Sequence, residues 1–230
     1  MEIIDITFNE SDTTQKRLIK ATKALIAVYG YAAMTTRMIA NTAQVTLSAI
    51  NFHFGSKENL VKAAMEDAAA NFERGYADLS NEIMEFLQKK PVDKEKAWEY
   101  LDRFLTDRIG KIFNSKTSWI NIGIAEHESG LPDSSRGILA ATVVEMNEKV
   151  LYELIMAVSD RPNELKAALL SRTINASIMT FIEKRFLSDA FSDSIGVDLS
   201  DLDTIQHMLH DQFLRSIETE VIVNPYRKRF

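Results

Sequence analysis

The chain has 230 residues with a net charge of −6, and 46% hydrophobic and 26% charged residues are typical of a soluble globular protein. The absence of cysteine excludes disulfides and thiolate metal sites. Only eight glycines and four prolines argue against an all-β fold. There is no apolar run of about 18 residues, and the first residues include acids where a signal peptide needs bases. We therefore expect no membrane span and a cytoplasmic location.

The first expected helix follows a short lead over residues 1–11. Asp12 or Thr13 is suited to cap this helix, because their side-chain oxygens can accept hydrogen bonds from the first free N–H groups. Apolar side chains then recur at helical spacing up to Tyr29. Gly30 is expected to end the helix.

Basic residues gather in residues 13–57, where there is no carboxylate. The six bases are Lys16, Arg17, Lys20, Lys23, Arg37 and Lys57. Since this window holds six of the 27 basic residues and none of the 33 acidic ones, the remainder of the chain has a net charge of −12. Such segregation costs self-repulsion and usually serves an anionic partner.

The same window predicts two short helices joined by a tight turn, the first over about 36–43 and the second from about 46 to 52. Thr35 is suited to cap the first of them. The apolar knot where the two helices cross would be formed by Ile39, Ala40, Ala43, Val45 and Ile50. With the basic window, this pattern predicts a helix-turn-helix that docks on duplex DNA.

The second of these helices would present its start to the major groove. Hydroxyl and amide groups can hydrogen-bond base edges, and small apolar groups can touch thymine methyls. The candidates for reading bases are Thr46, Leu47, Ser48, Ala49 and Asn51. The candidates for phosphate contacts are Thr35, Thr36, Arg37, His53 and Lys57. Phe52 and Phe54 are expected to pack between this helix and the next one, without contact to bases.

Three segments share the spacing of a known family: Gly30 to Ala40, Ala43-Gln44-Val45, and Ile50 to Leu60 with its aromatic-His-aromatic-x-x-Lys run. They resemble the DNA-binding domain of the tetracycline-repressor (TetR) family, over residues 12 to about 62. The resemblance implies an all-helical homodimer that binds a palindromic operator and responds to an effector. By position, it assigns phosphate contacts to Thr35, His53 and Lys57, and the start of the recognition helix to the residues from Thr46 to Ala49.

Two positions depart from the family pattern. Gln44 stands where the family usually has glycine, which predicts a strained turn at this position. Asn51 stands where many members have tyrosine, and this leaves the set of base-reading residues open. Neither departure changes the expected fold.

The rest of the chain has a helical period throughout. A fourth helix is expected from a cap at Ser56 to about Lys89. Further helices are expected at about 94–113, 116–129, 134–159, 163–187 and 201–222. The expected class is therefore all-α with about nine helices. A three-helix DNA-binding domain would span 1–62, and a larger effector-binding and dimerisation domain would span 63–230.

The last two long helices carry apolar stripes that fit either a monomer core or a dimer interface. The family resemblance favours a four-helix dimer interface, and an operator with two half-sites requires a dimer. The stripes are Leu165, Leu169, Ile174, Ile178, Phe181 and Ile182, then Leu202, Ile205, Leu209, Phe213, Ile217 and Val221.

An effector cavity is expected among the helices of about 94–187, lined by apolar and methionine side chains. The candidate residues are Trp98, Phe104, Trp119, Ile122, Glu126, Met146 and Met179. Glu126, His127 and Glu128 form a polar cluster that is suited either to orient a ligand or to end a helix in water. No cofactor is expected.

Enzyme functions find little support in the sequence. A di-iron site needs Glu-x-x-His pairs, and no histidine here has a glutamate three residues before it. His207 and His210 have a spacing that could hold one metal, but no carboxylate frame accompanies them.

The favoured hypothesis is a repressor released by a small apolar or amphipathic ligand. The alternative is a helical interaction or cofactor-binding module whose helix-turn-helix no longer reads DNA.

Overall fold

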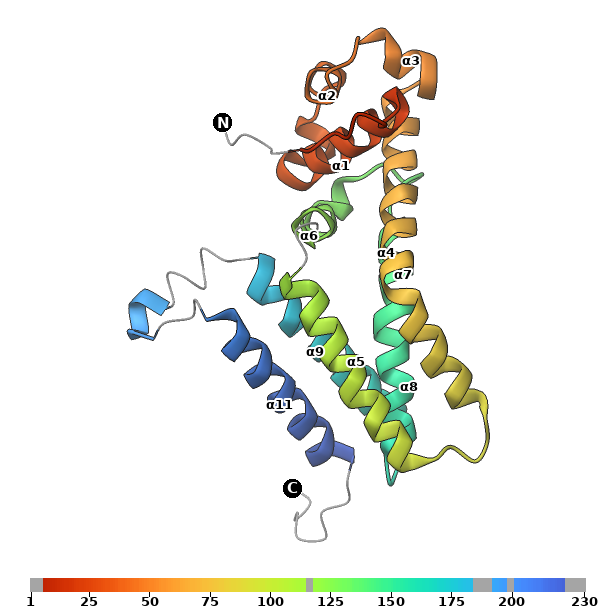
Figure 1. The fold of residues 1–230 in the computed structure, drawn as a ribbon, viewed down its shortest axis with the longest axis vertical. Helices are drawn as coiled ribbons and strands as arrows, with labels where there is room; N and C mark the ends of the chain where they lie inside the picture. The colour runs from red at the N-terminus through yellow and green to blue at the C-terminus, as the bar shows by residue number, and fades with distance from the viewer. Residues whose placement is uncertain (1–5, 115–117, 184–191, 198–200, 222–230) are drawn as a thin grey trace. The chain divides into compact units, whose positions relative to one another are not determined.

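The structure is a computed structural model that describes residues 6–114, 118–183, 192–197 and 201–221. All regular structure in these ranges is helical, so the expected all-α class is confirmed (Figure 1). None of the described helices combines the length and the apolar run that crossing a bilayer requires.

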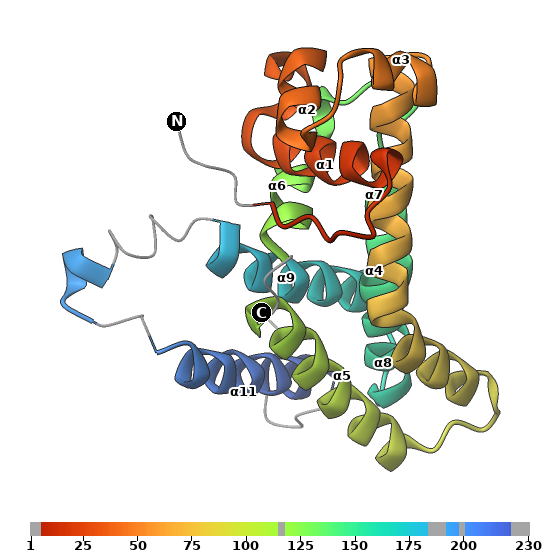
Figure 2. The same ribbon diagram turned by 45° about the horizontal axis from the view of Figure 1, so that its top comes forward.

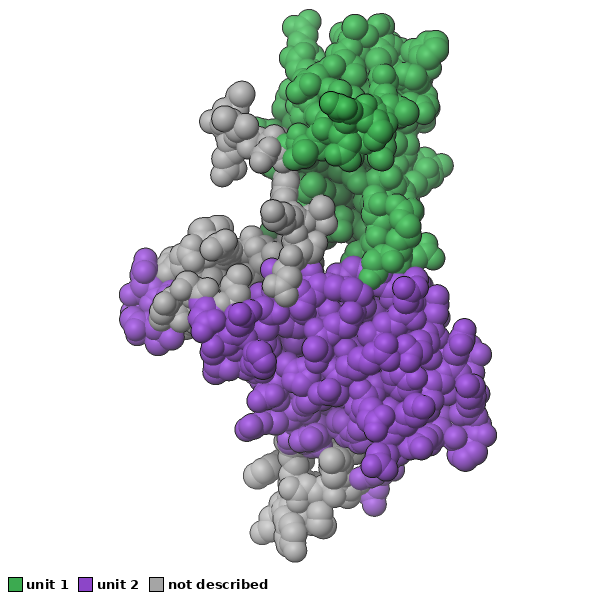
Figure 3. Space-filling model, in the orientation of Figure 1, with its two compact units in different colours: residues 1–75, 117–143 green, residues 76–116, 144–230 purple. Residues whose placement is uncertain are grey.

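The chain divides into two compact units (Figure 3). Unit 1 comprises residues 1–75 and 117–143, and unit 2 comprises residues 76–116 and 144–230. This division follows compactness and not function, so the expected domain boundary at residue 62 stays a prediction.

Unit 1 contains the expected helix-turn-helix. Its helices α1, α2 and α3 lie together with the first part of α4 and with α6 (Figure 2). The elements are α1 Thr14–Ala33, α2 Thr36–Ala43, α3 Ser48–Phe54, α4 Lys57–Gln88, α6 Ser118–Glu126, the 3₁₀ turn Glu128–Gly130 and α7 Ile138–Val143.

The helix starts in unit 1 are set by the capping residues that the sequence predicts. Thr13 Oγ1 accepts the N–H of Lys16 at 3.3 Å, and Thr35 Oγ1 accepts the N–H of Met38 at 3.1 Å. Ser56 Oγ in the same way accepts the N–H of the third residue after it at 3.1 Å. Gly30 leaves the helical path with φ 71° at the position where the sequence predicts the end of the first helix, but α1 resumes after this kink and ends at Ala33.

The turn after α2 is strained in the way that the sequence predicts. Gln44 has φ 56° and ψ 46°, the left-handed conformation that costs a residue with a Cβ roughly 1–2 kcal/mol. Arg17 on α1 holds this turn, because its Nε donates to the carbonyl of Ala43 at 2.9 Å and its Nη2 donates to Gln44 Oε1 at 2.8 Å. The glutamine thus gains a partner that glycine would lack.

Helix α6 packs closely against α1 within unit 1. A Cβ placed on Gly123 would lie 2.6 Å from the carbonyl oxygen of Ala27 and 2.9 Å from its Cα. Only glycine allows the two backbones to approach so closely. The expected helix at 116–129 therefore exists, and it belongs to the same compact unit as the helix-turn-helix.

Unit 2 contains the second part of α4, helix α5, and the helical elements that follow α7. The expected single helix over 134–159 is wrong in detail: it starts at Ile138 and passes through a π-helical turn before it continues as α8. The elements are α5 Lys94–Asn114, the π-helical turn η2 Val144–Glu148, α8 Lys149–Val158, α9 Glu164–Glu183 and α11 Leu202–Val221.

One hydrophobic core joins the helices of unit 2. The stripe residues of α9 and α11 divide between this core and the surface. Ile174, Ile178, Leu209, Phe213 and Ile217 are buried in it, whereas Leu165 and Leu169 are 70% and 59% exposed. Phe181, Ile182, Leu202 and Val221 fall outside the side chains that the structure describes.

Replacement of Gly123 by alanine tests the α1–α6 crossing. We expect Gly123→Ala to lower the free energy of unfolding by about 2 kcal/mol, because the added methyl group meets backbone atoms that cannot turn away. Gly75→Ala is the matched control, since a Cβ at this helical position on α4 meets nothing within 4 Å. The control should gain about 0.5–1 kcal/mol of stability from helix propensity. Urea unfolding measures both, and equal stability of Gly123→Ala and the parent would contradict the crossing.

The strain at residue 44 is tested by comparing two variants that both lack the glutamine side chain. Gln44→Gly should be more stable than Gln44→Ala by about 1 kcal/mol, because glycine adopts the left-handed conformation without strain. At a position with ordinary helical angles the order is the reverse. Thermal unfolding of the two proteins gives the order, and a more stable alanine variant would refute the strained turn.

Candidate nucleic-acid interface

The start of α3 is open to solvent, as a recognition helix requires. Thr46, Leu47, Ser48 and Asn51 are exposed, Leu47 by 49%, and Ala49 is partly buried. The hydroxyl oxygens of Thr46 and Ser48 lie 3.1 Å apart. The structure therefore brings the five candidate base readers onto one short segment that carries hydroxyl, amide and methyl groups and no charge.

The inner side of α3 is fixed to its neighbours. Ile50 is 1% exposed and packs in the core of unit 1 with Ile39, Ala40 and Ala43, as the apolar knot predicts. At the other end of α3, Asn59 Nδ2 donates to the carbonyl of Phe54 at 2.9 Å. The sequence did not predict this bond between the Asn59 side chain and the end of α3. The backbone N–H of Asn59 is the group that the Ser56 cap accepts.

Phe52 is not a core residue, which corrects the expectation from the sequence. Its side chain is 84% exposed on α3, and its ring meets that of His53 edge to face with 4.9 Å between centroids. Phe54 is partly buried, as expected. The helical period of α3 explains the error: Ile50 points inward, and a residue two positions later lies on the opposite side. Phe52 thus joins the exposed surface of α3.

Two of the basic side chains in the window have an internal acidic partner just outside it. Lys20 Nζ lies 2.5 Å from Asp12 Oδ2, and Lys16 Nζ lies 3.2 Å from Asp12 Oδ1. The hydrogen bond from Lys20, with those from the Asn9 backbone and Lys16, holds the pKa of Asp12 well below its usual range. These two lysines therefore tie the chain before α1 to that helix.

Two further cations bind inside unit 1. Lys23 Nζ lies 2.5 Å from Asp67 Oδ2 on α4. Arg17 holds the turn at Gln44 and stacks over the ring of Phe8 at 4.6 Å. The charge anomaly of the sequence is therefore largely a set of contacts that hold α1 to its neighbours.

Lys57, a candidate phosphate contact, also has an internal partner. Its Nζ donates to the carbonyl of Tyr31 at 2.8 Å and lies 4.0 Å from the centroid of the Tyr31 ring. Partial burial lowers the pKa of the Lys57 ammonium below its ordinary value. The side chain thus joins the start of α4 to the end of α1.

Arg37 is the exception among the six bases. Its side chain is exposed on α2 and makes no hydrogen bond or ion pair with the residues that the structure describes. Thr35 is exposed and caps α2, Thr36 is partly buried beside it, and His53 is partly buried on α3. Of the predicted phosphate contacts, Arg37 is the one whose charge is fully available to an anion.

The candidate ligand residues lie in different places. Phe104 is buried in unit 2 and lines a small cavity there, Trp98 packs against the core of unit 2, and Met146 lies in η2. Glu126 is exposed on α6 in unit 1. The side chains of Trp119, Ile122 and Met179 fall outside those that the structure describes. The assignment of these residues to a ligand stays a prediction.

The neighbours of Glu126 take structural roles in unit 1. A Cβ on Gly30 would lie 3.0 Å from His127 Nδ1, so the imidazole covers the end of α1. Glu128 Oε1 accepts the N–H of Gly137 at 2.9 Å. The polar cluster therefore divides between exposed and internally bonded groups.

Comparison with known proteins supports the interpretation of α2 and α3 as a helix-turn-helix. Residues 18–64 match the model of the family "Bacterial regulatory proteins, tetR family". A search of curated protein sequences finds no match to the chain.

Several solved structures share the fold. The TetR family transcriptional regulator PfmR from Thermus thermophilus has 18% identity and a TM-score of 0.56, over 86% of this chain and 97% of that one. NalD from Pseudomonas aeruginosa, the secondary repressor of the MexAB-OprM multidrug efflux pump, has 17% identity and a TM-score of 0.54, over 88% and 94%. The fatty acid degradation regulator FadR from Bacillus halodurans has 17% identity and a TM-score of 0.55, over 90% and 97%. Residues 18–64 thus match the family's model of a DNA-binding helix-turn-helix segment, and the chain as a whole shares the fold of these solved regulators.

Proposed function

We propose that the protein is a repressor that binds a palindromic operator as a homodimer and is released by a small apolar or amphipathic ligand. The observation that carries the proposal is the exposed, uncharged start of α3 next to the one base of α2 that keeps its charge free. Such a surface separates two roles, since phosphate contacts give affinity and register and base contacts give specificity. Repression is also the function named for NalD, which shares the fold.

On this proposal Thr46, Ser48 and Asn51 read base edges through hydrogen bonds, while Leu47 and Ala49 contact thymine methyl groups. Phe52 joins them as an apolar contact, because a ring that is 84% exposed gains from burial against a deoxyribose or a thymine methyl. Thr35, Thr36, Arg37, His53 and Lys57 face phosphates, Lys57 with the ammonium protons that Tyr31 leaves free.

The homodimer is supported by apolar side chains that unit 2 leaves uncovered. Leu165 and Leu169 are exposed on α9, and Met208 is 67% exposed on α11. Burial of such side chains contributes about 1.5–3 kcal/mol each. A second copy of the same surface would cover them and would place two recognition helices on one operator.

Selection from random-sequence duplexes tests the function directly. We expect enrichment of a palindrome, because each subunit of a dimer reads one half-site. Asn51→Ala and Ser48→Ala should each change the preferred base at one position per half-site, at a cost of about 1–3 kcal/mol for the original base. Leu169→Glu should instead reduce the selected site to a single half. A selection without any enriched palindrome would favour the alternative of a helix-turn-helix that no longer reads DNA.

The role of Arg37 is tested through the salt dependence of operator binding. A dimer that neutralises about four phosphates, through Arg37 and Lys57 of each subunit, should give a slope of about −4 for log affinity against log salt. Arg37→Ala should make this slope less steep by about 2, one unit per subunit, without a change in the preferred sequence. Arg161→Ala is the matched control: it removes an exposed arginine from unit 2 with the same change in net charge. Equal slopes for the two variants would exclude Arg37 as a phosphate contact.

A further inference from the structure

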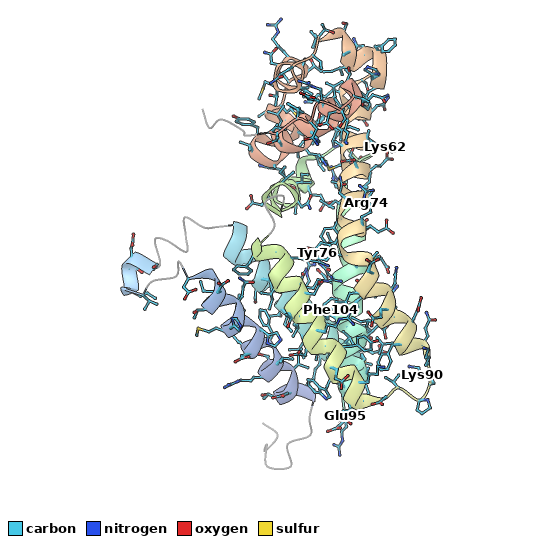
Figure 4. The ribbon with its side chains drawn as sticks, viewed as in Figure 1. Lys62, Arg74, Tyr76, Lys90, Glu95 and Phe104 are labelled. Carbon is cyan, nitrogen blue, oxygen red and sulfur yellow. The ribbon has the colours of Figure 1, made fainter. Side chains whose placement is uncertain are left out.

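Arg108 of α5 carries a buried positive charge in unit 2. The residue is 2% exposed, and the free energy of burying a guanidinium is high unless it is paired and hydrogen-bonded. Nη1 donates to Asp107 Oδ2 at 2.5 Å, and Nη2 donates to Ser80 Oγ at 2.6 Å and approaches the carbonyl oxygens of Tyr76 and Met146 at 3.3 Å each. The guanidinium lies 4.6 Å from the ring centroid of Tyr76 and 4.4 Å from that of Phe104, the two rings labelled in Figure 4.

One donor of this guanidinium stays unused. Arg108 Nε is buried and has no hydrogen-bond partner within the described part of the chain. Such an orphan donor carries a desolvation cost of about 1–3 kcal/mol, more where the group is charged. An oxygen from outside the protein would remove this cost.

Asn147 provides an unsatisfied acceptor that matches the unsatisfied donor of Arg108, and both residues line one small cavity. Asn147 in the π-helical turn η2 is 7% exposed, and its Oδ1 has no partner among the described residues. The cavity is lined by Arg108, Asn147 and Asn175 and by apolar side chains of α5, α8 and α9. As it stands, it has room for about one water molecule. Two residues that each carry an unsatisfied buried polar atom, one a donor and one an acceptor, thus line the same small cavity.

The orphan acceptor of Asn147 decides which polar group fits. A carboxylate has no proton to donate, so it would meet the Asn147 oxygen as a second acceptor and leave it without a partner. A hydroxyl or primary amide accepts from Nε–H and donates to Oδ1 with one uncharged group.

From this geometry we infer that Arg108 and Asn147 are the polar anchor for an effector with a small apolar body and a single uncharged hydroxyl or amide group. This inference rests on the proposed repressor function only for the effect of the ligand on DNA binding. Since the cavity is small, the apolar body must open it, and the π-helical turn is the element suited to move. π-helical turns are weaker than α-helix and are frequent at functional sites.

The anchor also contacts the two segments through which the chain passes into unit 2. Tyr76 is the first residue of unit 2 on α4, and η2 is the first segment of unit 2 after α7. Arg108 binds the carbonyls of both Tyr76 and Met146, and Ser80 Oγ also donates to Met146 O at 3.0 Å. A ligand that binds Nε and shifts the guanidinium changes these bonds in both segments. Ligand-bound and ligand-free proteins then differ in these contacts, and coupling to DNA binding requires such a difference.

Titration of the full chain with three six-carbon probes tests the anchor without DNA. The probes are 1-hexanol, hexanamide and hexanoate, followed by NMR of the protein. We expect 1-hexanol and hexanamide to bind at least tenfold more tightly than hexanoate. Asn147→Leu, which keeps the volume and removes the acceptor, should weaken 1-hexanol about tenfold. Asn81→Leu is the control, because Asn81 is exposed on α4 of the same unit.

The variant is expected to fold, because leucine replaces a buried acceptor that lacks a partner, and its melting temperature should equal or exceed that of the parent. Hexanoate binding as tight as hexanol, or hexanol binding unchanged in Asn147→Leu, would overturn the anchor. Operator affinity measured with and without 1-hexanol separates the two proposals. Specific operator binding without hexanol binding overturns this inference alone, whereas hexanol binding in a protein that selects no operator overturns the proposed repressor.

Discussion

A buried guanidinium must keep its hydrogen-bond partners, and this requirement organises unit 2. Arg108 takes acceptors from α4, from its own helix and from the π-helical turn, so these three elements are fixed by one side chain. The surrounding core of α5, α8, α9 and α11 excludes water from it. Removal of any one acceptor would leave a buried charge short of a partner, which costs far more than the bond itself contributes.

The basic window has a different meaning in the structure than in the sequence. Lys16, Lys20 and Lys23 pair with Asp12 and Asp67, which lie before the window or after it. Charge patterning along the sequence cannot show these pairs, because it counts neighbours in the chain and not in space. The remaining free charge on this surface is small, and the recognition segment itself is neutral.

Local rules predicted local structure well. The caps at Thr13, Thr35 and Ser56 follow from side-chain oxygens that reach N–H groups three residues on. The left-handed Gln44 follows from the family resemblance, because the family usually has glycine at this position. These features depend on a few adjacent residues, which the sequence displays directly. The family match covers the same part of the chain, so pattern and comparison agree where the signal is local.

Features that depend on distant segments were not predictable. The π-helical turn at Val144–Glu148 is stabilised by side chains from α4, α5 and α9, including Ser171 Oγ, which donates to Glu148 O at 2.7 Å. The sequence of the turn does not predict these donors, because they lie on other helices. Arg108 was likewise missed, because one arginine on an amphipathic helix resembles any solvated residue until its burial is known. Phe52 was misplaced because both Phe52 and Phe54 were expected to pack between two helices, whereas a short helix buries only one side.

The internal pairing of the α1 cations has a kinetic consequence. Electrostatic steering speeds the approach of a protein to DNA when free positive charge faces the duplex, and sliding along DNA depends on the same nonspecific attraction. Here the chain is acidic overall, with a net charge of −6, and Arg37 is the main unpaired cation described beside the recognition helix. Such a protein is expected to associate slowly, to leave unrelated DNA quickly and to remain mostly in free solution until it meets a sequence that its neutral side chains can hold.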